Sequence, residues 1–423
     1  MKVLVISHNV FCMNTNMGKT LSAYFSGWAK DDIAQLYVHA ETPTGEVCEN
    51  YYRITDKDAI KSIITRRCGT IYTGAAQPDI SAQNRSRVTA ALYQKGKSRT
   101  PAIYIARDLW WKLSAWKSKK LLDWVDGFDP DVIFLASGDY GFIYRIALEL
   151  AKYKNIPLAV SCMDDYYFYN KNKNRFLGKT VHRGFLKQVR KTMDYASCIF
   201  SICEKMSADY GRLFGKPCHT LHTPSTVKSG RGFDKKTGIS YMGNLGFKRN
   251  EQLVKLGKAL KSIDCPNKPE YIDVYSMETR EELLKDLNLS NGIMFHGGIP
   301  PQQVPEVMGK SMAVIHTESF DKDARKAVLY SVSTKIADSL ASGTCILAYG
   351  PAEVASMEYL QSNRAAFCIT DDEQLEAALI RFLTDEALRE QIADNALALA
   401  RKNHDGANNR RLIKDGLAAI CEK

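Results

Sequence analysis

Short apolar runs alternate with segments of helical period along nearly the whole chain of 423 residues. In the first half, the apolar runs are residues 2–7, 33–40, 131–137, 156–161 and 198–203, and helical period marks 18–29 and 141–154. In the second half, the apolar runs are 239–243, 271–276, 292–297, 312–317, 344–349 and 366–370, and the helices expected between them are 249–263, 279–287, 301–310 and 333–342. Strands that alternate with helices form parallel sheets with helices on both faces. The sequence therefore predicts an α/β protein with doubly wound parallel sheets.

One polar segment interrupts this alternation. Residues 223–238, "TPSTVKSGRGFDKKTG", contain turn-forming and charged residues without an apolar period, as expected for a linker. We therefore predict two domains, residues 1–228 and 229–404, and a C-terminal helix at 405–423 that packs back on the first domain. Ligands of such sheets bind beyond the carboxyl ends of the strands, so the expected site is a cleft between two such edges.

The overall composition is that of a soluble globular protein, with 45% hydrophobic and 25% charged residues. No run of 18 apolar residues occurs, and the N-terminus lacks the small-residue cleavage site of a signal peptide. The eleven cysteines include no Cys-x-x-Cys pair, and most lie in apolar runs. We therefore expect packed, reduced thiols and a cytoplasmic protein.

Basic residues are concentrated in two segments. The formal net charge is +11, and residues 85–120 carry ten Lys or Arg against one acid, while residues 171–191 carry eight and no acid. Residues 106–124 interleave four tryptophans with lysines, and a helix at 177–193 would be basic on one face and apolar on the other. Such surfaces suit an anionic membrane, although a buried helix with a solvated basic face explains them equally well. No nucleic-acid-reading motif accompanies the charge, so no nucleic-acid partner is expected.

The first apolar run is followed by "NTNMGKT" at residues 14–20, which is similar to the start of a nucleotide-phosphate loop. A strict loop of that kind needs a second glycine five residues before Gly18, because successive amides must surround the phosphates. That position is Met13. A P-loop ATPase or kinase is therefore not the preferred interpretation, and residues 14–20 are expected to form another kind of polar loop.

The segment that carries most chemistry is "SVSTKIADSLASGTCILAYGP", residues 331–351. Ser333 is a plausible N-cap and Gly343 a plausible C′ residue of one short helix. Its amide groups at Ser333 and Thr334, with the positive end of the helix dipole, could bind a diphosphate. Lys335 adds a charge there, and Asp338 could accept hydrogen bonds from sugar hydroxyls. A surface helix with a Lys335–Asp338 ion pair is the alternative that spacing alone leaves open.

Four stretches in order, 241–260, 294–308, 313–319 and 333–351, resemble the C-terminal half of GT-B glycosyltransferases. The likeness is to the retaining family 4 type, which builds capsule, O-antigen and other bacterial surface glycans. It implies two Rossmann-like doubly wound domains facing a central cleft, with the acceptor on the first domain and the donor on the second. It also implies a UDP- or GDP-sugar donor, a glycan or lipid-linked acceptor, retention of anomeric configuration, and no cofactor or metal.

The resemblance assigns donor-binding roles to particular residues. An Arg of the family corresponds to Asn244 here, and the Lys that follows it corresponds to Lys248 or Arg249. The ribose-binding Glu corresponds to Asp338. A second family Glu would fall at Tyr330. Glu318, beside a longer loop at 319–332, is the candidate to take its place.

Further binding residues are expected at the ends of other strands. Residues 129–165 resemble a family stretch that ends in His-Asp, but here it ends Asp164-Asp165, and Asp164 is an acceptor-side candidate. Gly18 would let the loop after the first strand approach donor or acceptor, and Gly297 is expected near the donor. His8, His296 and His316 end apolar runs, where ligand contact and a structural role are equally plausible.

Transfer from a nucleotide sugar requires stabilisation of the departing diphosphate. The "DPD" motif at 129–131 lies at a strand entrance, so a metal held by Asp-x-Asp is not expected. The cationic set Lys248, Arg249 and Lys335, with the helix start at Ser333, can serve instead. The candidate catalytic residues are Lys335, Arg249, Glu318 and Asp164. A nucleotide-sugar epimerase and a non-catalytic sugar-nucleotide or glycan-binding protein are the alternative functions.

Overall fold

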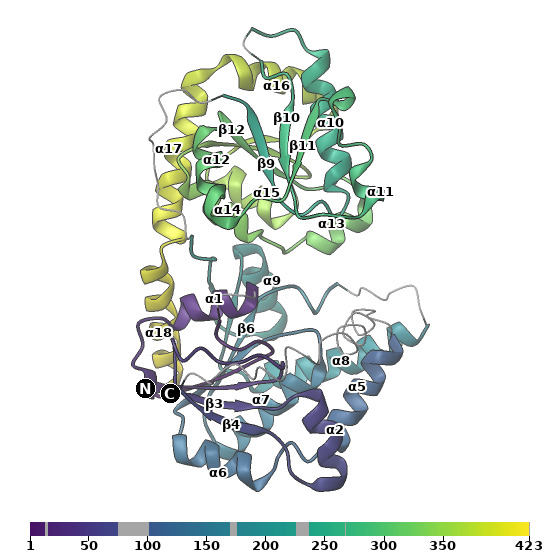
Figure 1. Ribbon diagram of the computed structural model, residues 1–423. Coiled ribbons are helices and arrows are strands. Elements are labelled where there is room, and N and C mark those ends of the chain that lie inside the picture. The colour runs from purple at the N-terminus through teal and green to yellow at the C-terminus, as the bar shows by residue number, and fades with distance from the viewer. Residues whose placement is uncertain (13–15, 75–100, 170–175, 226–236, 267, 423) are drawn as a thin grey trace. The chain divides into compact units, whose positions relative to one another are not determined.

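The computed structural model describes residues 1–12, 16–74, 101–169, 176–225, 237–266 and 268–422 (Figure 1). Most of the expected linker at 223–238, and part of each basic segment and of the 14–20 loop, lie outside the described residues. The chain divides into two compact units. The first holds Met1–Ser201, Met206–Leu221 and Arg410–Lys423, and the second holds Ile202–Lys205 and His222–Asn409.

The first unit is built on an eight-stranded sheet of order β4-β3-β2-β1-β5-β6-β7-β8. The strands are β1 Val3–Ser7, β2 Ile33–Tyr37, β3 Asn50–Arg53, β4 Thr70–Thr73, β5 Val132–Ala136, β6 Leu158–Cys162, β7 Cys198–Ser201 and β8 Cys218–Thr220. All neighbours pair in parallel except β3 and β4, which are antiparallel. The central strands are buried along their whole length, as expected for a sheet covered on both faces.

Eight described helices accompany this sheet. They are α1 Asn16–Phe25, α2 Asp56–Thr65, α5 Pro101–Leu113, α6 Lys119–Phe128, α7 Gly141–Lys154, α8 Phe176–Tyr195, α9 Glu204–Phe214 and α18 Gly406–Cys421. Helix α18 contributes Ile413, Leu417 and Ile420 to the same core cluster as β1 and β5. The C-terminal helix thus completes the core of the unit that contains the N-terminus, and Figure 1 shows the two termini close together.

The second unit has a six-stranded, fully parallel sheet of order β11-β10-β9-β12-β13-β14. The strands are β9 Ile239–Met242, β10 Ile272–Tyr275, β11 Ile293–Gly297, β12 Ala313–Thr317, β13 Cys345–Tyr349 and β14 Phe367–Ile369. Its helices are α10 Arg249–Ser262, α11 Glu281–Leu284, α12 Val304–Lys310, α13 Lys322–Val328, α14 Thr334–Ala341, α15 Ala355–Ser362, α16 Leu375–Thr384 and α17 Glu386–Asn403. Two core clusters, one on each side of the sheet, hold these layers together.

The predicted fold class, two doubly wound parallel-sheet domains, is confirmed, while the central cleft stays a prediction. Two details differ from expectation. The loop expected at 319–332 contains α13, because Asp321 caps its first turn by accepting from the amides of Asp323 and Ala324. The polar loop expected at 14–20 contains the start of α1 from Asn16 onward, so Gly18 lies inside a helix.

All eleven cysteines belong to the described part of the chain, carry no disulfide, and most are buried, as predicted. Among the described residues, no helix combines the length and apolarity needed to cross a bilayer.

Candidate functional site

The short helix α14 forms as its sequence dictates. The Ser333 side chain caps it by accepting from the Lys335 amide at 3.4 Å, and Gly343 follows its last turn with a left-handed φ of 72°. Its buried side chains are the predicted apolar set Ile336, Ala337, Leu340 and Ala341. This packing directs the amino end of the helix, with Lys335, into a cavity.

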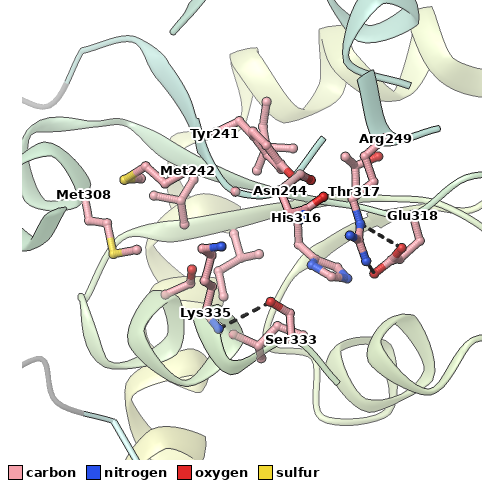
Figure 2. A pocket seen from close by; sticks show the side chains of 16 residues that line it. Tyr241, Met242, Asn244, Arg249, Met308, His316, Thr317, Glu318, Ser333 and Lys335 are labelled. Carbon is pink, nitrogen blue, oxygen red and sulfur yellow. Dashed lines mark hydrogen bonds and ion pairs between the residues drawn. The ribbon is translucent and has the colours of Figure 1, made fainter. Parts of the chain in front are cut away.

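The cavity has a volume of about 60 Å³ and lies in the second unit, at the carboxyl ends of β9 and β12 (Figure 2). Its polar lining consists of Tyr241, Asn244, Arg249, His316, Thr317, Glu318, Ser333, Lys335 and Ser339. Met242, Met308, Val314, Ile315, Ile336 and Ile346 form its apolar lining. The carboxyl ends of β9 and β12, the start of α14 and the cationic side chains of Arg249 and Lys335 therefore meet at one small cavity.

A second cavity of about 360 Å³ adjoins the first. The two share Met242, Gly243, Asn244 and Lys335, so Lys335 lies where they join. The rest of the larger lining follows β10 and β11 and consists of Tyr275, Ser276, Met277, Glu278, Gly298, Ile299 and Val304. The two cavities together form one groove along the strand ends. The smaller cavity is its narrow, charged end, and the larger cavity is its wider, more apolar end.

Arg249 and Glu318 form a two-point ion pair in the wall of the smaller cavity. The Nε and Nη2 atoms of Arg249 donate to the two carboxylate oxygens of Glu318 at 3.0 and 2.7 Å. Only 14% of the Arg249 side chain and 1% of the Glu318 side chain is exposed. Burial raises the pKa of Glu318, and the guanidinium opposes that shift. The pair fixes the plane of the guanidinium, and Nη1 takes no part in it.

Lys335 is the second cation of this cavity. Its side chain is exposed to solvent in part. Partial desolvation by the surrounding protein lowers its pKa, and the charge of the nearby Arg249 lowers it further. Two cations thus share a space in which one carboxylate, Glu318, is already paired. The Asp338 carboxylate offsets part of the positive charge at Lys335. An anion bound between the two cations would offset more of it.

His316 lies beside the Arg249–Glu318 pair in Figure 2. Its pKa is lowered to about 3, first by burial and then by the Arg249 charge. Its Nε2 lies 3.0 Å from the Ser356 hydroxyl. His316 is therefore neutral at physiological pH, so it can donate or accept a hydrogen bond but adds no charge.

The structure brings together Asn244, Arg249, Glu318, Ser333 and Lys335 of the predicted site residues. Other predicted donor residues lie elsewhere. Lys248 points to Asp321 at 2.8 Å, and Asp338 accepts from Ser225 at 2.9 Å, so neither lines the cavities. Thr334 is exposed beside the helix start, and Gly297 ends β11 with a φ of 72°, next to the lining residue Gly298.

The two predicted residues from the first unit occupy other environments. Gly18 is buried within α1 and not in the polar loop that was expected. Asp164 follows β6, and its Oδ1 accepts from the amide of Asp165 at 2.9 Å. Asp165 is itself buried and accepts from the Tyr210 hydroxyl. The acceptor role of Asp164 stays a prediction.

Sequence reasoning missed the walls of the groove. Tyr241, Tyr275 and Met277 are lining residues that were not predicted, although each lies at or just after the end of a parallel strand. That position was the available signal. No three His, Cys, Asp or Glu side chains gather as a metal site in the portion of the chain that the structure describes.

The second unit resembles a known protein family in sequence, and the whole chain resembles solved structures in fold. Residues 273–415 match the family model described as glycosyl transferase-like. The UDP complex of Anabaena HepE aligns with a TM-score of 0.62 at 12% identity, over 99% of this chain and 100% of that one. The α,α-trehalose 6-phosphate synthase of Burkholderia multivorans aligns at 0.61 and 11%, over 100% and 97%. No curated protein sequence matches the chain significantly.

These likenesses show the GT-B fold, and residues 273–415 resemble a glycosyl transferase-like domain. The predicted enzyme class, glycosyltransferase, is confirmed at this level. Membership of family 4 stays a prediction. The matched domain begins in β10 and includes β12 and α14, so it supplies Glu318 and Lys335, whereas Arg249 lies before it.

Proposed function

We propose that the protein is a retaining, metal-independent glycosyltransferase that moves a sugar from UDP to a glycan or lipid-linked acceptor of bacterial surface polysaccharide. The observation that carries this proposal is the cavity at the amino end of α14, which is lined by Arg249 and by Lys335 of that helix. Helix amides, the helix dipole and two cations are the groups that bind a diphosphate. The acceptor class and the retaining outcome rest on the sequence resemblance.

The choice of UDP is supported by the relatives and by the shape of the groove. The HepE structures are complexes with UDP and with UDP-glucose. In our proposal the diphosphate lies in the smaller cavity and the nucleoside in the larger one, against Tyr275 and Ile299. Lys335, which lines both, would then contact the phosphates next to the ribose. A volume of about 360 Å³ suits a group of nucleoside size.

The catalytic proposal follows from charge. As the sugar leaves UDP, negative charge grows on the diphosphate while the anomeric carbon becomes cationic. Lys335 and Nη1 of Arg249 would bind the first charge, and the Glu318 pair holds Arg249 in place before the reaction begins. Preorganised cations of this kind can replace a divalent metal. Glu318 is then a positioning residue, because it orients Arg249 through the two-point pair.

A nucleotide panel tests the function. Thermal shift with UDP, GDP, CMP and ADP in EDTA should reveal stabilisation by UDP. Incubation with UDP-sugars and a lipid-linked acceptor should then yield a glycoside whose anomeric configuration, read by NMR, equals that of the donor. A free 2-epimer without acceptor would favour the epimerase alternative. Binding without any turnover would favour the non-catalytic one, and UDP binding that requires Mg²⁺ would contradict metal independence.

The proposed cellular place is the cytoplasmic face of the membrane, where a lipid-linked acceptor would be reached. This part of the proposal needs a surface that contacts lipid.

A further inference from the structure

Helix α5 directs three side chains with polar groups, Tyr104, Arg107 and Trp111, toward neighbouring elements, whereas Lys112 is exposed. The Tyr104 hydroxyl donates to Asp139 at 2.8 Å, and Arg107 Nε donates to Asp56 at 2.9 Å. The Trp111 indole donates to the same Asp56 oxygen at 2.8 Å. These contacts fix the rotation of the helix about its axis.

With that rotation fixed, the apolar arc of α5 faces solvent. Ile105, Leu109, Trp110 and Leu113 are exposed by 43%, 50%, 40% and 55%. At 100° per residue they fall on one continuous arc, spaced i, i+4, i+5 and i+8. We call these four residues the α5 stripe. Water contact with a contiguous apolar stripe is unfavourable, and such patches mark binding surfaces.

Helix α2, which packs against α5, extends the apolar surface. Ile60 and Ile64, one turn apart, are exposed by 41% and 87%. Lys57 and Lys61 are also exposed on α2, and the exposed Arg66 and Arg67 follow it. The apolar surface therefore has a basic border on this side.

Helix α8 packs against α5 as well and adds a second basic border. Its exposed basic residues are Lys179, Arg183, Lys187, Arg190 and Lys191, as the sequence predicts. The apolar side chains of α8 from Val181 onward are buried or half-buried, so this part of α8 contributes charge rather than apolar area. Asp108, the acid of α5, is already paired with Arg145 and Lys112. The charge presented around the stripe is thus positive.

The tryptophans of 106–124 contribute differently from the sequence-based expectation. Trp111, Trp116 and Trp124 are buried, and Trp111 stacks on Phe142 with ring centroids 4.2 Å apart. Only Trp110 among these four remains at the surface. The interleaved pattern therefore reflects core packing at three positions, and the α5 stripe, with Trp110 as its one tryptophan, takes the place expected of an aromatic belt.

We propose that α2, α5 and α8 form a docking surface for an anionic lipid bilayer, with the α5 stripe inserted among the acyl chains and the basic borders on the headgroups. An apolar stripe bordered by exposed Lys and Arg matches both layers of such a membrane. The surface would bring a lipid-linked acceptor to the first unit, so this inference deepens the proposed function and rests on it for its biological purpose.

Vesicle sedimentation with the full-length protein tests the surface. The protein should bind vesicles of phosphatidylcholine with phosphatidylglycerol far better than phosphatidylcholine alone, and the binding should fall with salt. The double variant Leu109→Glu/Leu113→Glu should lose at least about 10-fold in partitioning. Replacing Lys179, Arg183 and Lys187 by Gln should weaken binding on the order of 5-fold per charge. Leu289→Glu, at a site 53% exposed in the second unit, is the matched control and should bind as wild type.

Fluorescence adds a readout that a folding defect cannot imitate. Brominated lipids should quench the wild-type tryptophan signal, and Trp110→Phe should remove that quenching while vesicle binding persists. Wild-type protein that ignores anionic vesicles, or a Leu109→Glu/Leu113→Glu variant that binds them normally, would overturn the inference. So would a wild-type dimer that the same variant makes monomeric, because a second copy would then cover the stripe. UDP-induced thermal shifts of each variant separate this failure from failure of the proposed function.

Discussion

Two ion pairs of the second unit begin at consecutive residues but lie in opposite environments. Lys248 pairs with Asp321 at the surface, where 47% and 32% of the side chains are exposed, and Arg249 pairs with Glu318 in the cavity wall, where 14% and 1% are exposed. The Lys248 ammonium holds the pKa of Asp321 at about 2, whereas burial raises the pKa of Glu318. The same pair of charge types is thus a solvated contact in one place and a buried part of a cavity wall in the other.

This difference predicts which pair matters for stability. Glu318→Ala should destabilise the second unit by about 3–5 kcal/mol, because it leaves the buried Arg249 guanidinium without its partner. Urea unfolding measures the loss. Lys248→Ala is the matched control, and it should change stability by about 0–1 kcal/mol, as for exposed pairs. Equal losses in the two variants would contradict the distinction.

The second prediction concerns Lys335, which lines the same cavity as Arg249 and Glu318. Lys335→Ala should lower the rate of sugar transfer on the order of 10²-fold, because one preorganised contact to the leaving diphosphate is lost. Steady-state kinetics with a UDP-sugar donor measure it. Lys335→Arg should recover part of the rate, and Lys248→Ala should stay near the wild-type value. A normal rate in Lys335→Ala would remove the residue from the site.

The pH dependence of binding sharpens the role of Lys335. Its pKa is lowered in the free protein, and a bound diphosphate would raise it again by favouring the charged form. UDP affinity should therefore weaken as the pH rises through the free-state pKa, and binding in that range should take up a proton. Calorimetry in two buffers of different ionisation enthalpy measures this uptake. Proton release instead would contradict the assignment.

A smaller effect tests how far the Arg249 charge reaches. Arg249→Met should raise the pKa of His316 from its value of about 3, because one of the two causes of the shift is removed while burial remains. A change of about one unit corresponds to about 1.4 kcal/mol of interaction. NMR of labelled histidine, assigned with a His316→Gln variant, follows the titration. Lys248→Ala should leave the His316 titration where it is.

Local signals made much of the second unit predictable. Ser333 and Gly343 bound α14 through caps that depend on neighbouring residues only, and the helix period fixed its buried face. The choice between Lys248 and Arg249 could not be made from sequence. It depends on Glu318, 69 residues from Arg249, and on strand β12, which buries that carboxylate against α10. Side-chain direction there is a tertiary property.

Other side-chain environments also depend on residues distant in the sequence. Asp338 corresponds to a ligand-binding position in the sequence pattern, and in the structure its carboxylate accepts from Ser225. Its role in donor binding stays a prediction. Gly18 was assigned to a loop whose backbone would approach donor or acceptor, but it is buried inside α1. The α5 stripe was not foreseen, since composition gave no indication that the polar arc of α5 would be the buried one.

Calorimetric titration of UDP in EDTA into wild-type protein, Lys335→Ala and Lys248→Ala tests the central claim most directly. The account predicts saturable binding at one site, weakened at least about 10-fold in Lys335→Ala by loss of a charged contact and unchanged in Lys248→Ala. Wild-type protein that does not bind UDP, or equal affinity in all three proteins, would contradict the claim that the cavity at the start of α14 is the diphosphate site.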